Sequence, residues 1–302
     1  MIDRELERVR VITKIGFVGV GMMGHGMAKN LMKAGNDLTG VAHRNRAPVD
    51  DLVGLGALES PKLAGVSASS DIIFFCLSNS SVVEAVVAEL KPDLRAGQII
   101  IDATTARPQS TVALHEELKE LGVHFVDAPI TANPEKAELG QLTSLVGAAH
   151  EVFRQVEPLI QSYSATVLHF GPTGMGHTAK LMNNFVTQAT GQLLALSYSV
   201  ARQAGVDWTK LHAAMSGGAA KSGTFEKMIT PALEGDYRGH EFTLANSWKD
   251  IRYFAEFAES LGRKPTLVEG VLDALEAVNV AGFGDRYVSE MLDPEVDTKL
   301  NA

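Results

Sequence analysis

Short, mostly apolar runs recur along the first half of the chain, and each has the length of a strand. They cover residues 15–20, 37–43, 71–77, 98–104 and 123–129. Segments whose apolar residues have helical spacing separate most of these runs, for example residues 80–90 and 110–121. This alternation predicts an α/β domain, a doubly wound parallel sheet with helices on both faces. We place this domain at residues 12–172.

The pattern changes at about residue 173. Residues 174–205 form one long stretch with helical spacing, near the upper length of helices in globular proteins. The remaining residues show only helical or loop patterns. We therefore expect residues 173–302 to form an all-helical C-terminal domain, joined to the first domain by a long interdomain helix.

Composition narrows the classes of function. The 302 residues are 45% apolar and 21% charged, which suits a globular protein with a sizeable core. The net charge of −9 argues against general nucleic-acid binding, because attraction to phosphates needs a basic surface. The single cysteine, Cys76, lies among apolar residues and is expected to be a core thiol. No apolar run has membrane-spanning length, and the first residues are too charged for a signal peptide, so we expect a cytoplasmic enzyme.

A G-x-G-x-x-G motif connects the first strand to a helical stretch. Its glycines are Gly19, Gly21 and Gly24, and Met22 and Met23 lie between the last two. The first glycine suits a tight turn, the second lets a pyrophosphate approach the backbone, and the third lets helix and strand pack closely. These five residues are therefore expected to bind a nicotinamide dinucleotide in a Rossmann-type domain. The alternative is a tight strand-to-helix turn that binds nothing.

The end of the second strand indicates which nicotinamide is preferred. NAD-selective sites usually carry an acidic residue there, but this chain has His43, Arg44, Asn45 and Arg46. Arg44, supported by Arg46 or His43, could bind a 2′-phosphate through charge-assisted hydrogen bonds. We expect NADP to be preferred, with NAD possible. The alternative is a solvated basic loop.

Lys180 lies on the long, otherwise apolar helical stretch. Asn184, Thr187, Gln188 and Gly191 follow it at spacings that place them on the same helix face, as expected for one wall of a cleft. A second lysine, Lys249, precedes Asp250. Two amines near one cleft would each lower the pKa of the other, and burial would lower it further, so that a lysine could exchange a proton near neutral pH. The alternative is a lysine that extends to solvent.

Four segments, in order, resemble motifs of the β-hydroxyacid dehydrogenases, which include 3-hydroxyisobutyrate dehydrogenase and tartronate semialdehyde reductase. They are GFVGVGMMGHGMAKNLMKAG for the cofactor, VDAPITANPEKAELGQLTSLVGA for the substrate, GPTGMGHTAKLMNNF for catalysis and WKDIRYFAEFA near the C-terminus. The resemblance covers nearly the whole chain after residue 12. It implies interconversion of a small β-hydroxy acid, or a similar anionic alcohol, with its semialdehyde or ketone. It also implies a homodimer or homotetramer with the active site at the domain junction.

The resemblance also implies roles for particular residues. Lys180 would be the catalytic acid and base, and Asn184 would orient the substrate. Lys249 would lie near the substrate and the nicotinamide, and Asp250, on the same motif, would belong to the cofactor site. The cofactor would be bordered by Leu77, Ser78, Asn79, Thr104 and Thr105.

One motif departs from the family pattern. Where the family commonly has Ser-Gly-Gly to receive a carboxylate, this chain has Thr131, Ala132 and Asn133, followed by Pro134. Proline removes a backbone donor, so a substrate with a bulkier or differently charged group is a second hypothesis. The sulfolactaldehyde reductases of the family also depart here, but they bring an arginine into the loop; Arg107 and Lys221 are candidate cations in this chain.

Two other functions remain as alternatives for this sequence. Imine reductases have a related layout but usually lack a lysine at the place of Lys180, and a nonenzymatic NADPH-binding protein would need no such amine. His25 and His177 have no partner at metal-ligand spacing, so we expect structural roles and no metal site. Asp102 and Asp127 end strands at the edge of the sheet where sites form, but either could equally be a turn residue.

Overall fold

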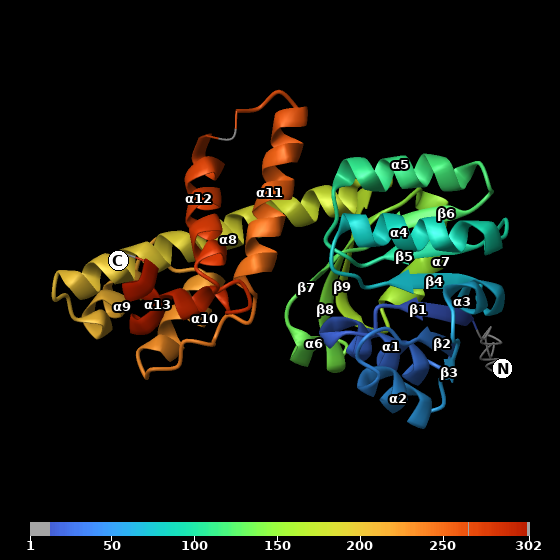
Figure 1. Ribbon diagram of the computed structural model, residues 1–302, viewed down its shortest axis with the longest axis horizontal. Coiled ribbons are helices and arrows are strands. Elements are labelled where there is room, and N and C mark those ends of the chain that lie inside the picture. The colour runs from blue at the N-terminus through green and yellow to red at the C-terminus, as the bar shows by residue number, and fades with distance from the viewer. Residues whose placement is uncertain (1–12, 265, 301–302) are drawn as a thin grey trace, which may run out of the picture. The chain divides into compact units, whose positions relative to one another are not determined.

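The computed structural model describes residues 13–264 and 266–300 (Figure 1). The chain divides into two compact units, with the boundary between Ala179 and Lys180. The boundary falls inside one continuous helix, so that this helix begins in the first unit and continues in the second. No helix among the described residues is both long enough and apolar enough to cross a membrane.

The first unit contains one sheet, in the strand order β3-β2-β1-β4-β5-β6-β8-β7, with β9 beside β8. The strands are β1 (Lys14–Val18), β2 (Asp37–Val41), β3 (Leu58–Glu59), β4 (Ile72–Phe75), β5 (Ile99–Asp102), β6 (His124–Asp127), β7 (Ile130–Thr131), β8 (Leu142–Gly147) and β9 (Ser164–Gly171). The first six strands are parallel. The strands β2 and β3 follow β1 towards one edge of the sheet, and β4, β5 and β6 then follow on the other side of β1, so the strand order reverses between β1 and β4. The predicted doubly wound domain is therefore confirmed.

Apolar residues alternate along these strands and supply a core on each face of the sheet. The helices are α1 (Met22–Lys33), α2 (Ala47–Gly54), α3 (Leu63–Ser69), α4 (Ser80–Leu90), α5 (Pro108–Lys119), α6 (Pro134–Glu138) and α7 (His150–Ile160), with the short 3-10 helix η1 (Lys91–Asp93) after α4. Phe74 packs with residues of α1, α2, α6 and α7 on one face. Its neighbours Ile73 and Phe75 pack with α3, α4 and α5 on the other, the two layers that Figure 1 shows.

The sheet differs from the expected one at its far edge. β8 runs antiparallel to both β6 and β7, and β9 then pairs with β8 in parallel. The sequence pattern predicts no strand after residue 129, so β7, β8 and β9 were all missed. β7 has only two residues, polar Thr143 and Ser144 interrupt the apolar residues of β8, and β9 combines apolar with exposed polar positions. An edge strand that is half solvated lacks the continuous apolar run of a buried parallel strand.

The second unit is helical in its described residues, as expected. It contains most of α8 (Met175–Gln203), followed by α9 (Trp208–Ser216), α10 (Gly223–Ala232), α11 (Leu244–Ser260), α12 (Thr266–Val280), the short 3-10 helix η2 (Val288–Leu292) and α13 (Pro294–Leu300). Side-chain caps begin three of the helices: Asp207 before α9, Ser222 before α10 and Thr243 before α11. Tyr198 of α8, Phe225 of α10 and Ile251 of α11 lie in the single large core cluster of this unit.

Candidate functional site

The glycine motif forms the turn between β1 and α1. Gly19 has a φ of +99°, and a Cβ there would lie 2.3 Å from the carbonyl oxygen of Cys76. A Cβ on Gly24 would lie 2.1 Å from the carbonyl oxygen of Gly19, so that only glycine lets the helix pack this closely on the turn. A Cβ on Gly21 would meet nothing within 4 Å. The backbone is therefore open on the side of the second glycine, where a pyrophosphate would approach.

The first turn of α1 suits an anion. Gly21 is the N-cap and has no side chain to satisfy the helix amides, and the first turn contains no acidic residue. The first amides of a helix have no partner within it, and the helix dipole favours negative charge at this end. Met22 is 72% exposed at the same place. These features fit the phosphates of a dinucleotide.

The two arginines at the end of β2 differ in their surroundings. Arg46 donates to both carboxylate oxygens of Glu59, at 2.9 Å each, and to Asp50 at 3.1 Å. His43, Arg44 and Asn45 are exposed. Arg44 forms no ion pair with any residue that the structure describes. Of the two guanidinium groups, that of Arg44 is the one available to a ligand.

The loops that follow β4 and β5 are joined to each other. The amide of Leu77 donates to the hydroxyl oxygen of Thr104 at 2.9 Å, and the amide of Thr104 donates to Asp102 at 2.9 Å. Asn79 caps α4 by accepting from the amide of Val82 at 3.0 Å, and its amide group donates to Ser78 at 3.3 Å. Both loops leave parallel strands at their carboxyl ends, the edge at which ligands bind in such sheets.

The predicted substrate loop, residues 131–133, has an unusual backbone. Ala132 has a φ of 100° and is the one non-glycine residue with positive φ in the described part of the chain. Asn133 caps the short helix α6, because its side-chain oxygen accepts from the amide of Lys136 at 3.1 Å. Thr131 ends β7 and is half-buried. The Asn133 side chain thus has a local structural role as a helix cap, which the sequence pattern did not indicate.

In the second unit, Asp250 connects two of the predicted site residues. It is 1% exposed; one carboxylate oxygen accepts from Asn184 at 2.6 Å, and the other forms an ion pair with Lys249 at 2.9 Å. Asn184 in turn accepts from Asn183 at 3.1 Å. Asp250, predicted as a cofactor residue, therefore orients the side chains of Asn184 and Lys249.

Lys180 is 7% exposed and does not extend to solvent. Burial lowers the pKa of its amine from 10.5 to about 8. The Asp250 carboxylate opposes this shift, and the Lys249 amine adds to it. Further along the same helix face, Gln188 accepts from Ser247 of α11 at 3.1 Å and is buried. The polar stripe predicted as a cleft wall therefore packs inside the helical unit at this point.

The remaining candidates have structural surroundings. His25 lies between Glu138 at 2.6 Å and Asp51 at 2.8 Å. His177 is fully buried among Thr104, Thr111 and the carboxylates of Asp102 and Asp127. Cys76 is partly buried and packs against the core of the first unit, and burial raises the pKa of its thiol to about 12, which disfavours the reactive thiolate. In the described residues, no three His, Cys, Asp or Glu side chains form a group that could bind a metal.

Comparison with known proteins identifies two matching families. Residues 14–171 match the NAD binding domain of 6-phosphogluconate dehydrogenase. Residues 174–294 match the NAD-binding family of NADP-dependent 3-hydroxyisobutyrate dehydrogenase. The first match confirms that the first unit is of a nicotinamide-binding type.

Two sequence relatives span most of the chain. The 2-(hydroxymethyl)glutarate dehydrogenase of Eubacterium barkeri is 32% identical over 79% of this chain and 80% of its own length. The 2-hydroxy-3-oxopropionate reductase of Escherichia coli is 31% identical over 82% of this chain and 85% of its own. Among solved structures, 3-hydroxyisobutyrate dehydrogenase of Mycobacterium tuberculosis superposes with a TM-score of 0.85 over 93% of this chain and 98% of its own, at 21% identity. That last likeness shows the fold alone.

Proposed function

The chain belongs to the β-hydroxyacid dehydrogenase family, and from that premise we propose that it interconverts a small β-hydroxy acid and its semialdehyde or ketone, with NADP as the preferred cofactor and Lys180 as the acid and base. The family evidence supports an NAD(P)-dependent hydroxyacid dehydrogenase. The substrate, the preference for NADP and the residue roles are our proposal.

One observation carries the assignment of Lys180. A buried amine whose pKa is lowered to about 8 is divided between its neutral and charged forms near neutral pH. In the oxidising direction, the neutral amine takes the hydroxyl proton while hydride leaves the same carbon and a carbonyl forms. In the reducing direction, the ammonium form returns that proton to the carbonyl oxygen. The nicotinamide supplies or accepts the hydride when it is bound.

Asn184, Lys249 and Asp250 support this chemistry. The Asp250 carboxylate holds the Asn184 amide and the Lys249 amine by one oxygen each. Asn184 is thereby fixed to bind a substrate oxygen, and the charge of Lys249 favours an anionic substrate. Because Asp250 is buried and uses both oxygens, we assign it to orienting these two side chains.

The cofactor assignment rests on the first unit. The open backbone at Gly21 and the uncapped first turn of α1 would receive the pyrophosphate. The exposed guanidinium of Arg44 would bind the 2′-phosphate that distinguishes NADP from NAD, whereas Arg46 is already bound to Glu59. Leu77, Ser78, Asn79 and Thr105 would border the rest of the cofactor.

The substrate loop departs from the family pattern for a carboxylate, so the head group of the substrate is a separate part of the proposal. Thr131 and the strained backbone of Ala132 would face the substrate, while the Asn133 side chain is occupied as a helix cap. The pair of glycine amides that receives a carboxylate in the family is absent here, so a sulfonate remains the second candidate head group.

A substrate panel tests the proposal. The purified protein is assayed with 3-hydroxy acids, semialdehydes, sulfonate aldehydes and cyclic imines, each with NADPH and with NADH. We expect the highest kcat/KM for a carboxylate semialdehyde with NADPH. Turnover of sulfonate aldehydes alone would establish the second candidate. Turnover of imines alone, or tight NADPH binding with no turnover of any compound, would contradict the proposal.

We also propose that the protein forms a homodimer through one face of α8. Residues 181–201 of this helix contain no charged side chain. A helix without charge on any face is typical of a buried element. Within this uncharged stretch, five apolar residues are nevertheless 38–66% exposed: Met182, Val186, Leu193, Leu196 and Val200.

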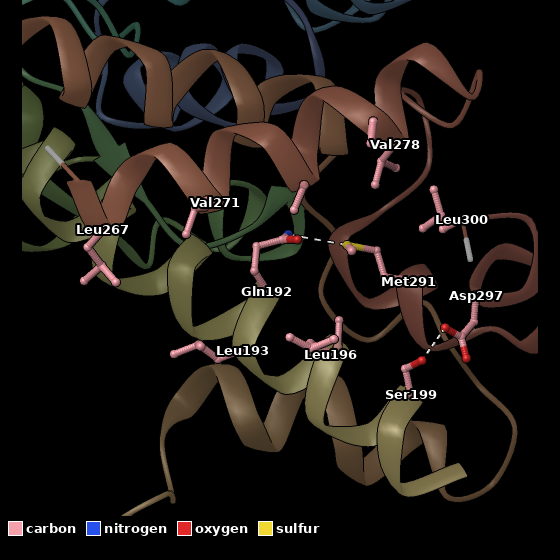
Figure 2. Close-up of a pocket in the computed structure, with 14 residues that line it drawn as sticks. Gln192, Leu193, Leu196, Ser199, Leu267, Val271, Val278, Met291, Asp297 and Leu300 are labelled. Atoms are coloured by element: carbon pink, nitrogen blue, oxygen red, sulfur yellow. Dashed lines mark hydrogen bonds between the residues drawn. The ribbon is translucent and has the colours of Figure 1, made fainter. Parts of the chain in front are cut away.

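The spacing of these residues supports a helical partner. Together with Ala189, these residues form one row along the helix, which we call the apolar seam of α8. The steps along it alternate between four and three residues, the spacing found where two helices pack along their length. Leu193 and Leu196 also line a cavity, together with Leu267 and Val271 of α12 (Figure 2). The volume of this cavity is about 410 Å³. A second copy of this chain supplies the same apolar seam and would cover both.

A further inference from the structure

Three titratable side chains that the proposed chemistry does not use are buried together in the first unit. His177 and the carboxylates of Asp102 and Asp127 are all fully buried. The His177 ring lies 4.0 Å from Asp102 and 3.9 Å from Asp127. Removing such groups from water costs free energy, so their presence calls for a specific role. The cluster joins four segments of chain.

The Asp127 carboxylate, at the end of β6, holds the start of α8. Its two oxygens accept from the amides of Gly174 at 2.6 Å and of His177 at 2.7 Å. A Cβ on Gly176 would lie 2.3 Å from the carbonyl oxygen of Leu145, so the first turn of the helix packs directly on the strands. Burial raises the pKa of Asp127 to about 7, while the hydrogen bonds from these two backbone amides oppose the shift.

The His177 ring connects this turn to the loop after β5. Its Nε2 lies 2.7 Å from the carbonyl oxygen of Thr104, and because a carbonyl can only accept, Nε2 carries a proton. Nδ1 lies 2.7 Å from the hydroxyl of Thr111 on α5, and the same hydroxyl lies 3.1 Å from the carbonyl oxygen of Arg107. Its one proton goes to Nδ1 when the imidazole is neutral, and to the Arg107 carbonyl when a protonated ring donates to it. The hydroxyl of Thr104 accepts from the amide of Leu77 and so extends the connection to the loop after β4.

We propose that His177 is a positioning residue: with Asp127 it fixes the first turn of α8 to the loops that border the cofactor, and so sets the placement of Lys180, which lies three residues further along the same helix. This inference rests on the proposed function, because the placement of Lys180 matters only if its amine is the acid and base. A spacing of three residues is less than one helical turn, about 4.5 Å along the axis. A displacement of about 1 Å in a reacting group can cost on the order of 10²-fold in rate.

The test compares His177→Ala with His177→Gln, and it measures kcat, KM and the Kd for NADPH on the folded fraction. The alanine variant should lose roughly 10- to 100-fold in kcat while its NADPH affinity stays near that of the wild type. Glutamine offers both a donor for the Thr104 carbonyl and an acceptor for Thr111, so it should restore most of the rate. A merely structural histidine would lower stability without this selective loss of kcat.

Two further variants keep the test decisive. Thr111→Val removes one partner of the ring at nearly constant volume and should lower kcat in the same direction, even if His177→Ala fails to fold. His169→Ala is the matched control, since that ring also bonds a carbonyl, that of Ala148 at 2.8 Å, but stacks on Phe153 of α7 and forms no hydrogen bond with α8 in the part of the chain that the structure describes. His169→Ala should lower stability only.

The proposal is overturned by wild-type kcat in Thr111→Val and in folded His177→Ala, or by a glutamine variant as slow as the alanine one. Failure of the proposed function would be seen separately, as turnover that survives Lys180→Ala in the same assays.

Discussion

At the scale of single residues, Ala132 shows a conflict between side chain and backbone. Its φ of 100° is costly for any residue with a Cβ. Ala132→Gly should therefore raise the free energy of unfolding by about 1 kcal/mol. Relief of the backbone strain stabilises the folded state by more than the greater entropy of glycine stabilises the unfolded chain. Denaturant unfolding measures this. Ala34→Gly, at a position with a φ of −73°, is the control and should be destabilising; an equal loss in both variants would show that Ala132 is unstrained.

Arg44 and Arg46 form a matched pair for testing cofactor preference. Arg44→Ala should weaken NADPH binding by about 1.5–3 kcal/mol, because charge-assisted bonds to a phosphate are lost, and should leave NADH binding nearly unchanged. Arg46→Ala should change the NADPH to NADH ratio much less, because that guanidinium is held by Glu59 and Asp50. Fluorescence titration with both cofactors decides the matter. Equal losses for the two cofactors in Arg44→Ala would refute the assigned role.

At the scale of elements, the sequence predicted those whose apolar pattern is continuous. The strands β1, β4, β5 and β6 are buried on both faces, and α4 has the predicted bounds of residues 80–90. The strands β7, β8 and β9 were missed because pairing with one another, and not a long local apolar run, determines them. Tertiary contacts thus decided the edge of the sheet.

The same distinction applies to the candidate site. Glycine spacing and a lysine on an apolar helix are visible in the sequence. The ion pair of Arg46 with Glu59 and the bond of Asn184 to Asp250 join residues far apart along the chain, so no local pattern indicates them. In the sequence, Asp127 is only a polar residue at the end of a strand, and His177 is only a polar residue inside the catalytic motif. Either feature equally fits a residue of a turn.

At the scale of the whole molecule, the apolar seam of α8 predicts a dimer. Leu193→Glu places a charge in that seam at a side chain that is 66% exposed in one chain, so the fold should tolerate it. Light scattering after gel filtration should show a dimer for the wild type and a monomer for this variant. Leu55→Glu, at a 53% exposed leucine of the first unit, should stay dimeric. A monomeric wild type, or a dimeric Leu193→Glu, would contradict the assigned interface.

In the proposed mechanism the first unit binds the cofactor, and Lys180 in the second unit exchanges the proton. The direction of the pH dependence follows from a pKa of about 8. The neutral amine is the base, so oxidation of the alcohol should accelerate as the pH rises through about 8. The ammonium is the acid, so reduction of the carbonyl should slow over the same range.

Steady-state kinetics of Lys180→Ala, beside NADPH titration of the same preparation, is the most direct measurement. Positioned proton transfer contributes roughly 10²–10⁴-fold, so kcat should fall by at least the lower factor while NADPH affinity is retained. The limb of the oxidation profile near pH 8 should disappear, and Lys180→Arg should not restore it, because arginine stays protonated. A kcat near that of the wild type in Lys180→Ala, with the pH limb intact, would contradict the mechanism.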